Sequence, residues 1–277
     1  MAQAETTDRT YIHGYKASHI QHHASRTAES HAAYLLPHLM NMAESHPQID
    51  LLDVGAGPGT ISASLAKYIP EGTVTATDIS DEVLERALSH ARECGQNNVK
   101  TKFADVYSLP FDDSSFDIVH ASQVLIHLNE PHRAVKEMLR VCKTGGIIAI
   151  RDADLKAWSV HPELPGLRSF QQAIGQVTSC MNAGSKLVAW AMEAGVKRED
   201  ITYSVGSFCY STPEERKMWG GAMRERLRDG GMREKLLQDG KWKKEQIEDM
   251  ERAWDQWIVT EDATFGSLNG EIVIKVK

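Results

Sequence analysis

The stretch LLDVGAGPGT, residues 51–60, decides the fold that this sequence predicts. Three apolar residues and one acid, Asp53, come before the first glycine, a pattern that indicates a short buried strand. Gly55, Gly57 and Gly59 then follow at every second position. Because glycine has no Cβ atom, such a loop can adopt positive φ angles and can let a ligand approach the backbone closely. The stretch therefore predicts a strand that runs into a loop shaped for a nucleotide-like ligand.

Two alternatives for the role of this loop stay open at this point. Dinucleotide-binding dehydrogenases also carry a glycine loop after their first strand, but with the spacing Gly-x-Gly-x-x-Gly. Here the spacing is Gly-x-Gly-x-Gly, and Asp53 stands two residues before the first glycine, where a dehydrogenase strand is usually apolar. A purely structural turn is the second alternative. The spacing and the acid together favour a cofactor other than a nicotinamide dinucleotide.

Downstream of the loop, short apolar segments alternate with amphipathic ones. The expected strands are residues 50–54, 73–78, 99–104, 116–121 and 147–151, and the expected helices are 59–68, 81–94 and 131–141. Such alternation predicts an α/β fold with a doubly wound, largely parallel sheet that helices cover on both faces. Residues 201–210 and 270–277 are expected to be extended as well, so that they complete a seven-stranded Rossmann-like sheet at one edge.

Two helical regions lie outside this alternation. Residues 25–42 have apolar side chains at helical spacing, and Pro37 is expected to bend or break that helix. Residues 212–257 are charged and helical and contain four of the six tryptophans, which indicates a helical insertion. We divide the chain into lid helices (1–48), a cofactor-binding core (49–155), and the remainder of the sheet with its insertion (156–277), all within one compact domain.

Two further acids are expected at the carboxyl edge of the sheet. Asp78 ends the second strand, where a carboxylate can accept hydrogen bonds from ribose hydroxyls. Standing just before Ser80 and Asp81, it is also a reasonable residue for the start of a helix. Asp105 follows the third strand and can accept from an adenine amino group, although turns are rich in such acids. Three acids after three successive strands indicate a ligand site at this edge more strongly than any one of them alone.

With these residues in place, the core resembles class I S-adenosylmethionine-dependent methyltransferases, in particular the ubiquinone/menaquinone-biosynthesis C-methyltransferase type. The resemblance covers roughly residues 11–152. It rests on the following motifs in this order: Leu52–Thr60, Asp78-Ile79-Ser80, Ala104-Asp105, Leu109-Pro110-Phe111, Ser115-Phe116-Asp117 and Glu137–Gly146. The expected fold accordingly ends in an antiparallel C-terminal hairpin, and the helical insertion departs from simpler members, which have a short turn there.

The resemblance implies roles for individual residues. The glycine loop would lie against the methionine part of the cofactor. The acid after the second strand would hold the ribose, and the acid after the third strand, with its neighbour, would hold the adenine. An N-terminal lid over residues 11–26 would fold over the cofactor, although for Arg26 a surface salt bridge is an equal alternative. The cofactor-binding residues expected on this basis are Tyr15, Arg26, Asp53, Gly55, Ala56, Gly57, Asp78, Ile79, Ala104, Asp105, Ser122 and Gln123.

The acceptor side of the site is less well determined. His127 lies just beyond the fourth strand, where a histidine with a pKa near ~6.5 could remove a proton from the acceptor, or could simply be a polar residue beside a helix. Asp262 and Phe265 are expected to return near the cofactor and to line the substrate pocket together with His127. Histidines are frequent before residue 39, but no neighbouring acid or cysteine completes a metal site, so we expect none.

Composition limits the function further. The formal net charge of −7 disfavours a nucleic-acid partner, and no apolar run is long enough to span a membrane. Four cysteines without a Cys-x-x-Cys pair indicate reduced thiols in the cytoplasm, and the oligomeric state stays open. We expect methyl transfer from S-adenosylmethionine, with S-adenosylhomocysteine as product, to the carbon or oxygen of a small, largely apolar acceptor. The alternative is a fold relative that binds the cofactor without transferring methyl.

Overall fold

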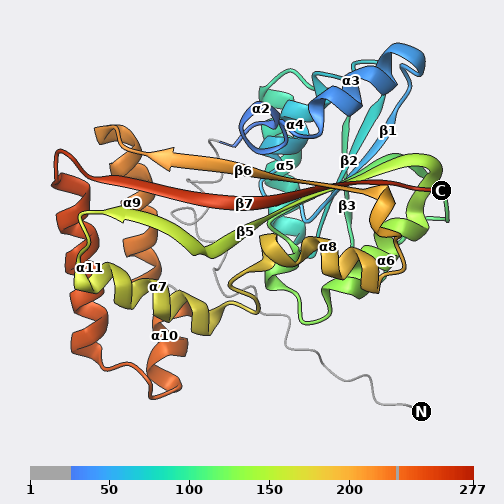
Figure 1. Ribbon diagram of the computed structural model, residues 1–277. Helices are drawn as coiled ribbons and strands as arrows, with labels where there is room; N and C mark the ends of the chain where they lie inside the picture. The colour runs from blue at the N-terminus through green and yellow to red at the C-terminus, as the bar shows by residue number, and fades with distance from the viewer. Residues whose placement is uncertain (1–25, 229–230) are drawn as a thin grey trace.

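A seven-stranded sheet forms the centre of the computed structural model, which describes residues 26–228 and 231–277 (Figure 1). The strands lie in the order β3-β2-β1-β4-β5-β7-β6. Their bounds are β1 (Asp50–Val54), β2 (Thr73–Asp78), β3 (Val99–Phe103), β4 (Phe116–Ser122), β5 (Cys142–His161), β6 (Ile201–Tyr210) and β7 (Thr264–Lys275). β1 to β5 pair in parallel, whereas β7 pairs antiparallel with both β5 and β6. The predicted α/β fold and its antiparallel C-terminal strands are confirmed.

Helices cover both faces of the parallel part of the sheet. On one face, α2 (Ala28–His31), α3 (Leu36–Ser45) and α4 (Thr60–Ala66) pack against Leu51 and Ile118. On the other face, α6 (Pro131–Val141) and α8 (Ala183–Glu193) pack against Ile148 and Ile150. α5 (Asp81–Glu93) lies against β2 and β3. Burial of both faces explains the apolar runs of the central strands, Leu51-Leu52 in β1 and Ile147–Ile150 in β5, whereas the edge strand β3 has exposed Lys100 and Lys102.

The predicted helix over residues 25–42 is broken, as Pro37 indicated. α2 ends at His31, and α3 begins at Leu36 with Pro37 in its first turn. A proline is well tolerated there because the first turn of a helix has no intrahelical partner for its backbone N–H groups. Arg26, two residues before α2, lines a cavity.

β5 and β7 are longer than the sequence predicted. β5 has 20 residues and β7 has 12, and their pairing continues to His161 and Thr264. The extra length carries both strands beyond the parallel sheet to a second group of helices (Figure 1). These are α7 (Pro165–Val177), α9 (Pro213–Arg228), α10 (Gly231–Gln238) and α11 (Lys244–Val259), which share an apolar core with the far ends of the strands.

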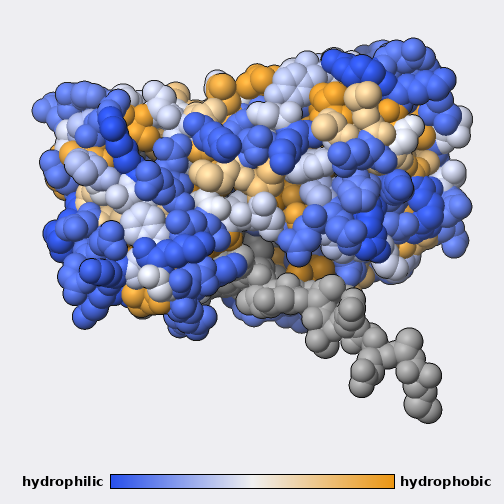
Figure 2. Space-filling model, turned by 60° about the horizontal axis from the view of Figure 1, so that its bottom comes forward, coloured by the Kyte–Doolittle hydropathy of each residue, from blue (hydrophilic) through white to orange (hydrophobic). Residues whose placement is uncertain are grey.

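Four large aromatic side chains are buried in the core of this second helical group. Phe170, Trp254, Trp257 and Phe265 are each at most 1 % exposed. The face drawn in Figure 2 is correspondingly hydrophilic over much of both ends of the molecule, with smaller hydrophobic groups between them. Within residues 26–228 and 231–277, no helix is long and apolar enough to cross a membrane.

The packing of α8 on the sheet depends on two glycines that face each other. A Cβ atom on Gly184 would lie 2.5 Å from the backbone nitrogen of Gly270 and 2.6 Å from the carbonyl oxygen of Asp152. We therefore expect Gly184→Ala to destabilise the protein by about 1–3 kcal/mol, the usual cost of overpacking. Denaturant unfolding measures this change. The matched control is Gly221→Ala in α9, where a Cβ meets no atom within 4 Å and the helix gains up to about 1 kcal/mol. Equal stability of the two variants would contradict this packing.

Candidate functional site

The glycine loop connects β1 to α4 and is anchored to the neighbouring strand. The backbone nitrogen of Ala56 donates to the carbonyl oxygen of Thr77 at the end of β2, over 2.8 Å. Gly57 has a φ of +55°, and a Cβ atom built on it would meet nothing within 4 Å. Gly59 has a φ of +73°, and its Cβ would lie 2.5 Å from that of Ala87 in α5. Gly59 therefore serves the packing of the loop, whereas Gly57 presents bare backbone to open space.

Asp53 lies directly beneath this loop. The residue is 2 % exposed, and its carboxylate accepts hydrogen bonds from Ser62 Oγ of α4, over 2.5 Å, and from His120 Nδ1 of β4, over 2.8 Å. Asp53 and His120 are register partners on adjacent strands, which explains their contact. A buried carboxylate is tolerated only when it is hydrogen-bonded in this way. Asp53 thus joins β1, β4 and α4 below the loop, and it also lines the cavity above it.

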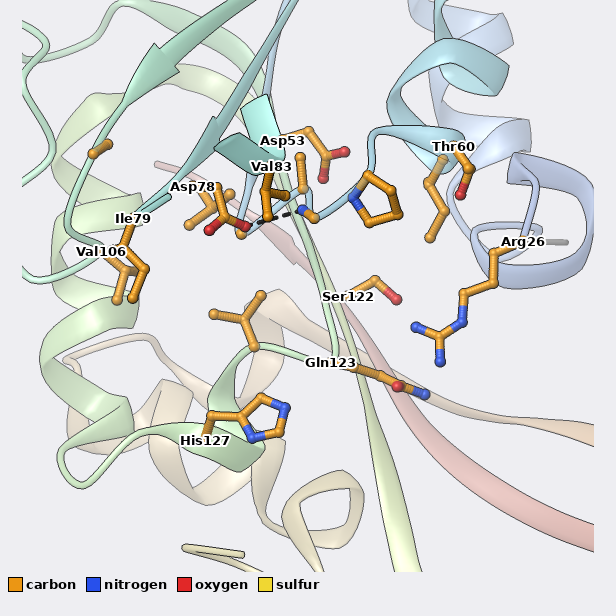
Figure 3. A pocket seen from close by; sticks show the side chains of 18 of the residues that line it. Arg26, Asp53, Thr60, Asp78, Ile79, Val83, Val106, Ser122, Gln123 and His127 are labelled. Carbon is orange, nitrogen blue, oxygen red and sulfur yellow. Dashed lines mark hydrogen bonds between the residues drawn. The ribbon is translucent and has the colours of Figure 1, made fainter. Parts of the chain in front are cut away.

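Asp78 ends β2 and points into the same cavity. Its Oδ2 accepts a hydrogen bond from the backbone nitrogen of Gly57, over 3.0 Å (Figure 3). Burial raises the pKa of the Asp78 carboxyl above its usual value, and the backbone N–H groups that it accepts from oppose that rise only in part. Additional hydroxyl donors would stabilise its charged form further. The carboxylate is therefore well suited to accept hydrogen bonds from a polyhydroxylated ligand.

These residues belong to a cavity of about 200 Å³ at the carboxyl edge of the parallel strands. Asp78, Ile79 and Val106 lie at one end, Arg26 points into it from the opposite end, and Ser122 lies between them (Figure 3). The lining consists of Arg26, Asp53, Val54, Gly55, Ala56, Gly57, Pro58, Thr60, Ile61, Asp78, Ile79, Val83, Ala104, Val106, Ser122, Gln123, Val124, His127 and Leu128. Ten of the twelve residues that the sequence indicated for the cofactor are brought together here.

Of the other two, only Asp105 is among the described residues. Asp105 does not line the cavity: its Oδ1 accepts from the backbone nitrogen of Tyr107, over 3.0 Å, and so stabilises the turn after β3. This is the alternative that the sequence left open for a turn acid. Tyr15, with most of the expected lid, lies outside the described residues.

A second, smaller cavity of about 70 Å³ adjoins the first. Arg26, Gln123 and His127 line both cavities, so they form the boundary between them. The far side is built by the long strands and the second helical group. Its remaining lining residues are His31, Ile126, Ala153, Leu155, Trp158, Ile174, Thr178, Phe208, Tyr210, Trp219, Met223, Arg226 and Ser267. The second cavity is therefore largely apolar, with four aromatic residues in its wall.

Phe265 lies directly behind this wall. It is 1 % exposed, and its ring centroid is 5.1 Å from those of both Trp158 and Trp219. Phe265 therefore supports the aromatic lining without being part of it. The expectation that Asp262 lines the pocket is wrong. Asp262 is exposed beside His161, because β7 begins at Thr264 and not at Gly270, which moves Asp262 to the far end of the long strands.

His127 is held at the boundary by a buried acid. It ends a short 3₁₀ helix, η1 (Leu125–His127). The carboxylate of Asp152 in β5 accepts from the backbone nitrogens of Leu125, over 2.9 Å, and Ile126, over 3.3 Å. Burial, and then the positive charges of Arg226 and Arg26, lower the pKa of His127 to about 4. The imidazole is consequently neutral at physiological pH and can accept a hydrogen bond or a proton, but it is a weak base.

Comparisons with known proteins agree with this geometry. Residues 52–150 match the model of a methyltransferase domain. An uncharacterized methyltransferase of Schizosaccharomyces pombe is 32% identical over 98% of this chain and 99% of its own length. A demethylmenaquinone methyltransferase of Clavibacter sepedonicus is 43% identical over 36% of this chain and 39% of its own. The crystal structure of the YcgJ protein of Bacillus subtilis superposes with a TM-score of 0.54 at 20% identity, covering 88% of this chain and 99% of that one. The chain belongs to the S-adenosylmethionine-dependent methyltransferases.

The geometry of the cavity itself fits that cofactor. Gly57 leaves bare backbone facing open space, and the buried Asp78 carboxylate lies beside it. Arg26, the positively charged group among the described lining residues of this cavity, is at the opposite end, where it can pair with an amino-acid carboxylate. An adenosyl group joined to an amino acid presents hydroxyls at one end and a carboxylate at the other, which is the same order.

Several features of the methyltransferase site had no clear signal in the sequence. Trp158 lies in the part of β5 beyond the predicted strand, which ends at residue 151. Arg226 is one of many charged residues in the helical insertion, and nothing in the sequence sets it apart. Gln123 was expected at the site, but not in the left-handed conformation that it adopts, with a φ of +57°. A non-glycine residue in that region is uncommon and costs about 1–3 kcal/mol, so it marks the boundary between the cavities as a constrained point of the backbone.

The unusual titration of His127 is directly measurable. We expect its imidazole to titrate near pH 4, because burial and two guanidinium groups disfavour the charged form. Nuclear magnetic resonance of the histidine ring protons over pH 3.5–8 reports this value. Arg226→Met removes one of the two positive charges and should move the titration upward, toward about 6.5. Arg228→Met is the control, because Arg228 pairs with Asp255 and is not among the charges that lower the pKa of His127. A wild-type His127 titrating near 6.5 would contradict the described environment.

Proposed function

We propose that this enzyme transfers the methyl group of S-adenosylmethionine to a carbon or oxygen atom of a small, largely apolar acceptor with a planar ring. The observation that carries the proposal is the aromatic second cavity, which adjoins the cofactor cavity along Arg26, Gln123 and His127. Planar faces of Trp158, Phe208, Tyr210 and Trp219 bury large areas against flat ligands. An acceptor held there would have its reacting atom at the shared boundary.

The cofactor is proposed to lie along the first cavity. Asp78 would accept hydrogen bonds from the ribose hydroxyls, and Ile79 and Ala104 would contact the adenine ring. The methionine portion would lie against the backbone of Gly55, Ala56 and Gly57, and its carboxylate would pair with Arg26. Ser122 and Gln123 would lie beside the sulfur. When bound, S-adenosylmethionine supplies a methyl group made electrophilic by a positively charged sulfonium.

The protein's own contribution to the reaction is positioning. Methyl transfer requires the acceptor atom, the methyl group and the sulfur to lie in line, and holding two reactants in that geometry can supply about 7 kcal/mol or more of the barrier lowering. The aromatic wall would fix the acceptor ring and exclude water from the boundary. Neutral His127 would accept a hydrogen bond or a proton from the acceptor. Its low pKa favours acceptors that are acidic or already ionised over an ordinary phenol.

Most of the acceptor side of the site is built outside the part of the chain that the methyltransferase-domain model matches. The residues that build the aromatic wall of the second cavity all lie beyond position 150, outside the stretch that matches the methyltransferase-domain model. The match to the demethylmenaquinone methyltransferase covers only about a third of the chain. The S. pombe relative, by contrast, matches over nearly the full length. We therefore base the proposed acceptor on the aromatic wall of this chain and not on the quinone substrates of those relatives.

Location and partners follow as part of the same proposal. The four cysteines are free thiols, which fits the reducing environment of the cytoplasm. The net charge of −7 fits a small-molecule partner better than a nucleic acid. We therefore propose a cytoplasmic enzyme of small-molecule metabolism.

A search for the product tests this function most directly. Purified enzyme and S-adenosylmethionine carrying a deuterated methyl group are added to a cell extract, and mass spectrometry follows compounds that gain a labelled methyl. We expect a small, ring-containing product that forms only when enzyme and cofactor are both present. An extract treated with the Asp78→Ala variant is the control for contaminating activity. Labelled macromolecules without any labelled small molecule would contradict the proposal.

The placement of the cofactor has its own test. Asp78→Ala removes an acceptor proposed to bind two ribose hydroxyls, and hydrogen bonds to charged groups contribute about 1.5–3 kcal/mol each. We expect affinity for S-adenosylhomocysteine, measured by isothermal titration calorimetry, to fall at least tenfold. Asp105→Ala is the matched control, because this acid serves a turn outside the cavity, and its affinity should stay within about twofold of wild type. A larger loss of affinity in Asp105→Ala than in Asp78→Ala would contradict the proposed position of the ribose.

A further inference from the structure

His31 brings a polar side chain to the largely apolar second cavity. It is the last residue of α2 and is partly buried. His31 lines the second cavity but not the cofactor cavity, in contrast to the three boundary residues Arg26, Gln123 and His127, which line both. A ligand group in contact with His31 therefore lies on the acceptor side of the boundary, away from the cofactor.

One nitrogen of the His31 ring is already engaged within α2. Its Nδ1 lies 2.8 Å from Ser30 Oγ, at hydrogen-bond distance. The capping box of this short helix fixes Ser30 in turn, because the backbone nitrogen of Thr27 donates to Ser30 Oγ over 3.0 Å. The other ring nitrogen, Nε2, has no hydrogen-bond partner among the described residues. The helix thus orients the ring through Nδ1, and Nε2 is the nitrogen left for a ligand.

The ring of His31 is neutral at physiological pH. Burial, and then the positive charges of Arg26 and Arg151, lower its pKa to about 3. A neutral imidazole offers one hydrogen bond at Nε2, which is a donor or an acceptor depending on which nitrogen holds the ring proton. An ammonium group beside His31 is disfavoured, because the same two guanidinium groups repel it. The ring therefore favours a polar group without positive charge.

A hydroxyl group fits this position best. It can both donate and accept, so it pairs with Nε2 whichever nitrogen of the His31 ring is protonated. A carbonyl or carboxylate oxygen only accepts, and it fits just one of the two ring forms. The aromatic wall of the same cavity suits a planar ring that carries the hydroxyl. A hydroxylated arene therefore matches both the polar and the apolar parts of the lining.

We propose that His31 is a specificity-determining residue of this methyltransferase and that its Nε2 binds a hydroxyl group of the acceptor. This inference rests on the proposed function, since it assigns the second cavity to the acceptor. Because His31 does not line the cofactor cavity, the hydroxyl that it binds is separate from the atom that is methylated, which lies at the boundary formed by Gln123 and His127. The acceptor is accordingly an arene with a hydroxyl in addition to its methyl-receiving carbon or oxygen.

Aromatic diols and the matching fluorophenols test this inference. Fluorine is close to a hydroxyl in size but cannot donate a hydrogen bond. The pairs are hydroquinone and 4-fluorophenol, resorcinol and 3-fluorophenol, and catechol and 2-fluorophenol, which cover the three spacings of two groups on one ring. The full chain is saturated with S-adenosylhomocysteine, and calorimetric titration gives the dissociation constants. In the pair with the best-fitting spacing, we expect the wild-type protein to bind the diol at least about fivefold more tightly, as one neutral hydrogen bond allows.

Variants of His31 then show whether this residue is the cause. His31→Phe keeps a flat ring without a polar atom, and it should reduce the preference to the statistical factor that two equivalent orientations of a symmetric diol give. His31→Gln, whose amide group reaches about as far as Nε2, should retain an intermediate preference. His46→Phe is the control, since His46 follows α3, is exposed and lines neither cavity. Unchanged affinity for S-adenosylhomocysteine verifies that each variant is folded.

Each outcome bears on one of the two proposals. A preference no larger than the statistical factor in every wild-type pair overturns the role of His31, as does a full preference in His31→Phe. An equal loss of both ligands in His31→Phe also overturns it, since it would indicate a role in cavity shape alone. If His31→Phe does not fold, His31→Leu takes its place and is judged in the same way. Failure of every ring compound to bind overturns the planar acceptor and this inference with it, whereas absence of labelled small-molecule product in the extract experiment overturns the proposed function whether or not diols bind.

Discussion

The buried carboxylate of Asp53 is the interaction on which the geometry of the cofactor cavity depends. It accepts from Ser62 of α4 and His120 of β4, while Thr77 of β2 donates to its backbone carbonyl oxygen over 3.2 Å. Three adjacent strands and the first core helix therefore meet at one residue, immediately before the glycine loop. Removing the carboxylate would leave two buried polar partners unsatisfied, at a cost of about 1–3 kcal/mol each. The loop can keep its left-handed glycines because its base is fixed in this way.

The parts of the site that the sequence predicted are those encoded locally. Asp78, Ile79 and Ala104 follow strands whose apolar pattern is plain, and the carboxyl ends of neighbouring parallel strands must meet at one edge. Their presence in one cavity needed no knowledge of distant contacts. Asp105 shows the limit of the same argument, since strand position alone does not say whether an acid faces the cavity or closes its own turn.

The acceptor side could not be predicted because it depends on contacts between distant segments. Residues 152–157 alternate polar and apolar side chains, as a half-buried strand does, but the alternation shifts by one residue at Trp158, so the pattern alone does not give the full extent of the strand. They are extended because β7 pairs with them, as far as His161 opposite Thr264. The error at Asp262 and the omission of Trp158 both follow from this pairing. Arg226 was hidden for a related reason, because in sequence it is one of several charged residues in an exposed-looking helix.

β5 holds the boundary between the two cavities in place. Gln123, in its left-handed conformation, donates its backbone N–H to the carbonyl oxygen of Arg151 over 2.8 Å, and the next residue of β5, Asp152, holds η1. Burial raises the pKa of Asp152 to about 7, while the backbone N–H groups of Ile126, Ala153 and Leu125 favour its charged form. The boundary between cofactor and acceptor is thus positioned by two consecutive residues of one strand. That strand continues directly into the aromatic wall at Trp158.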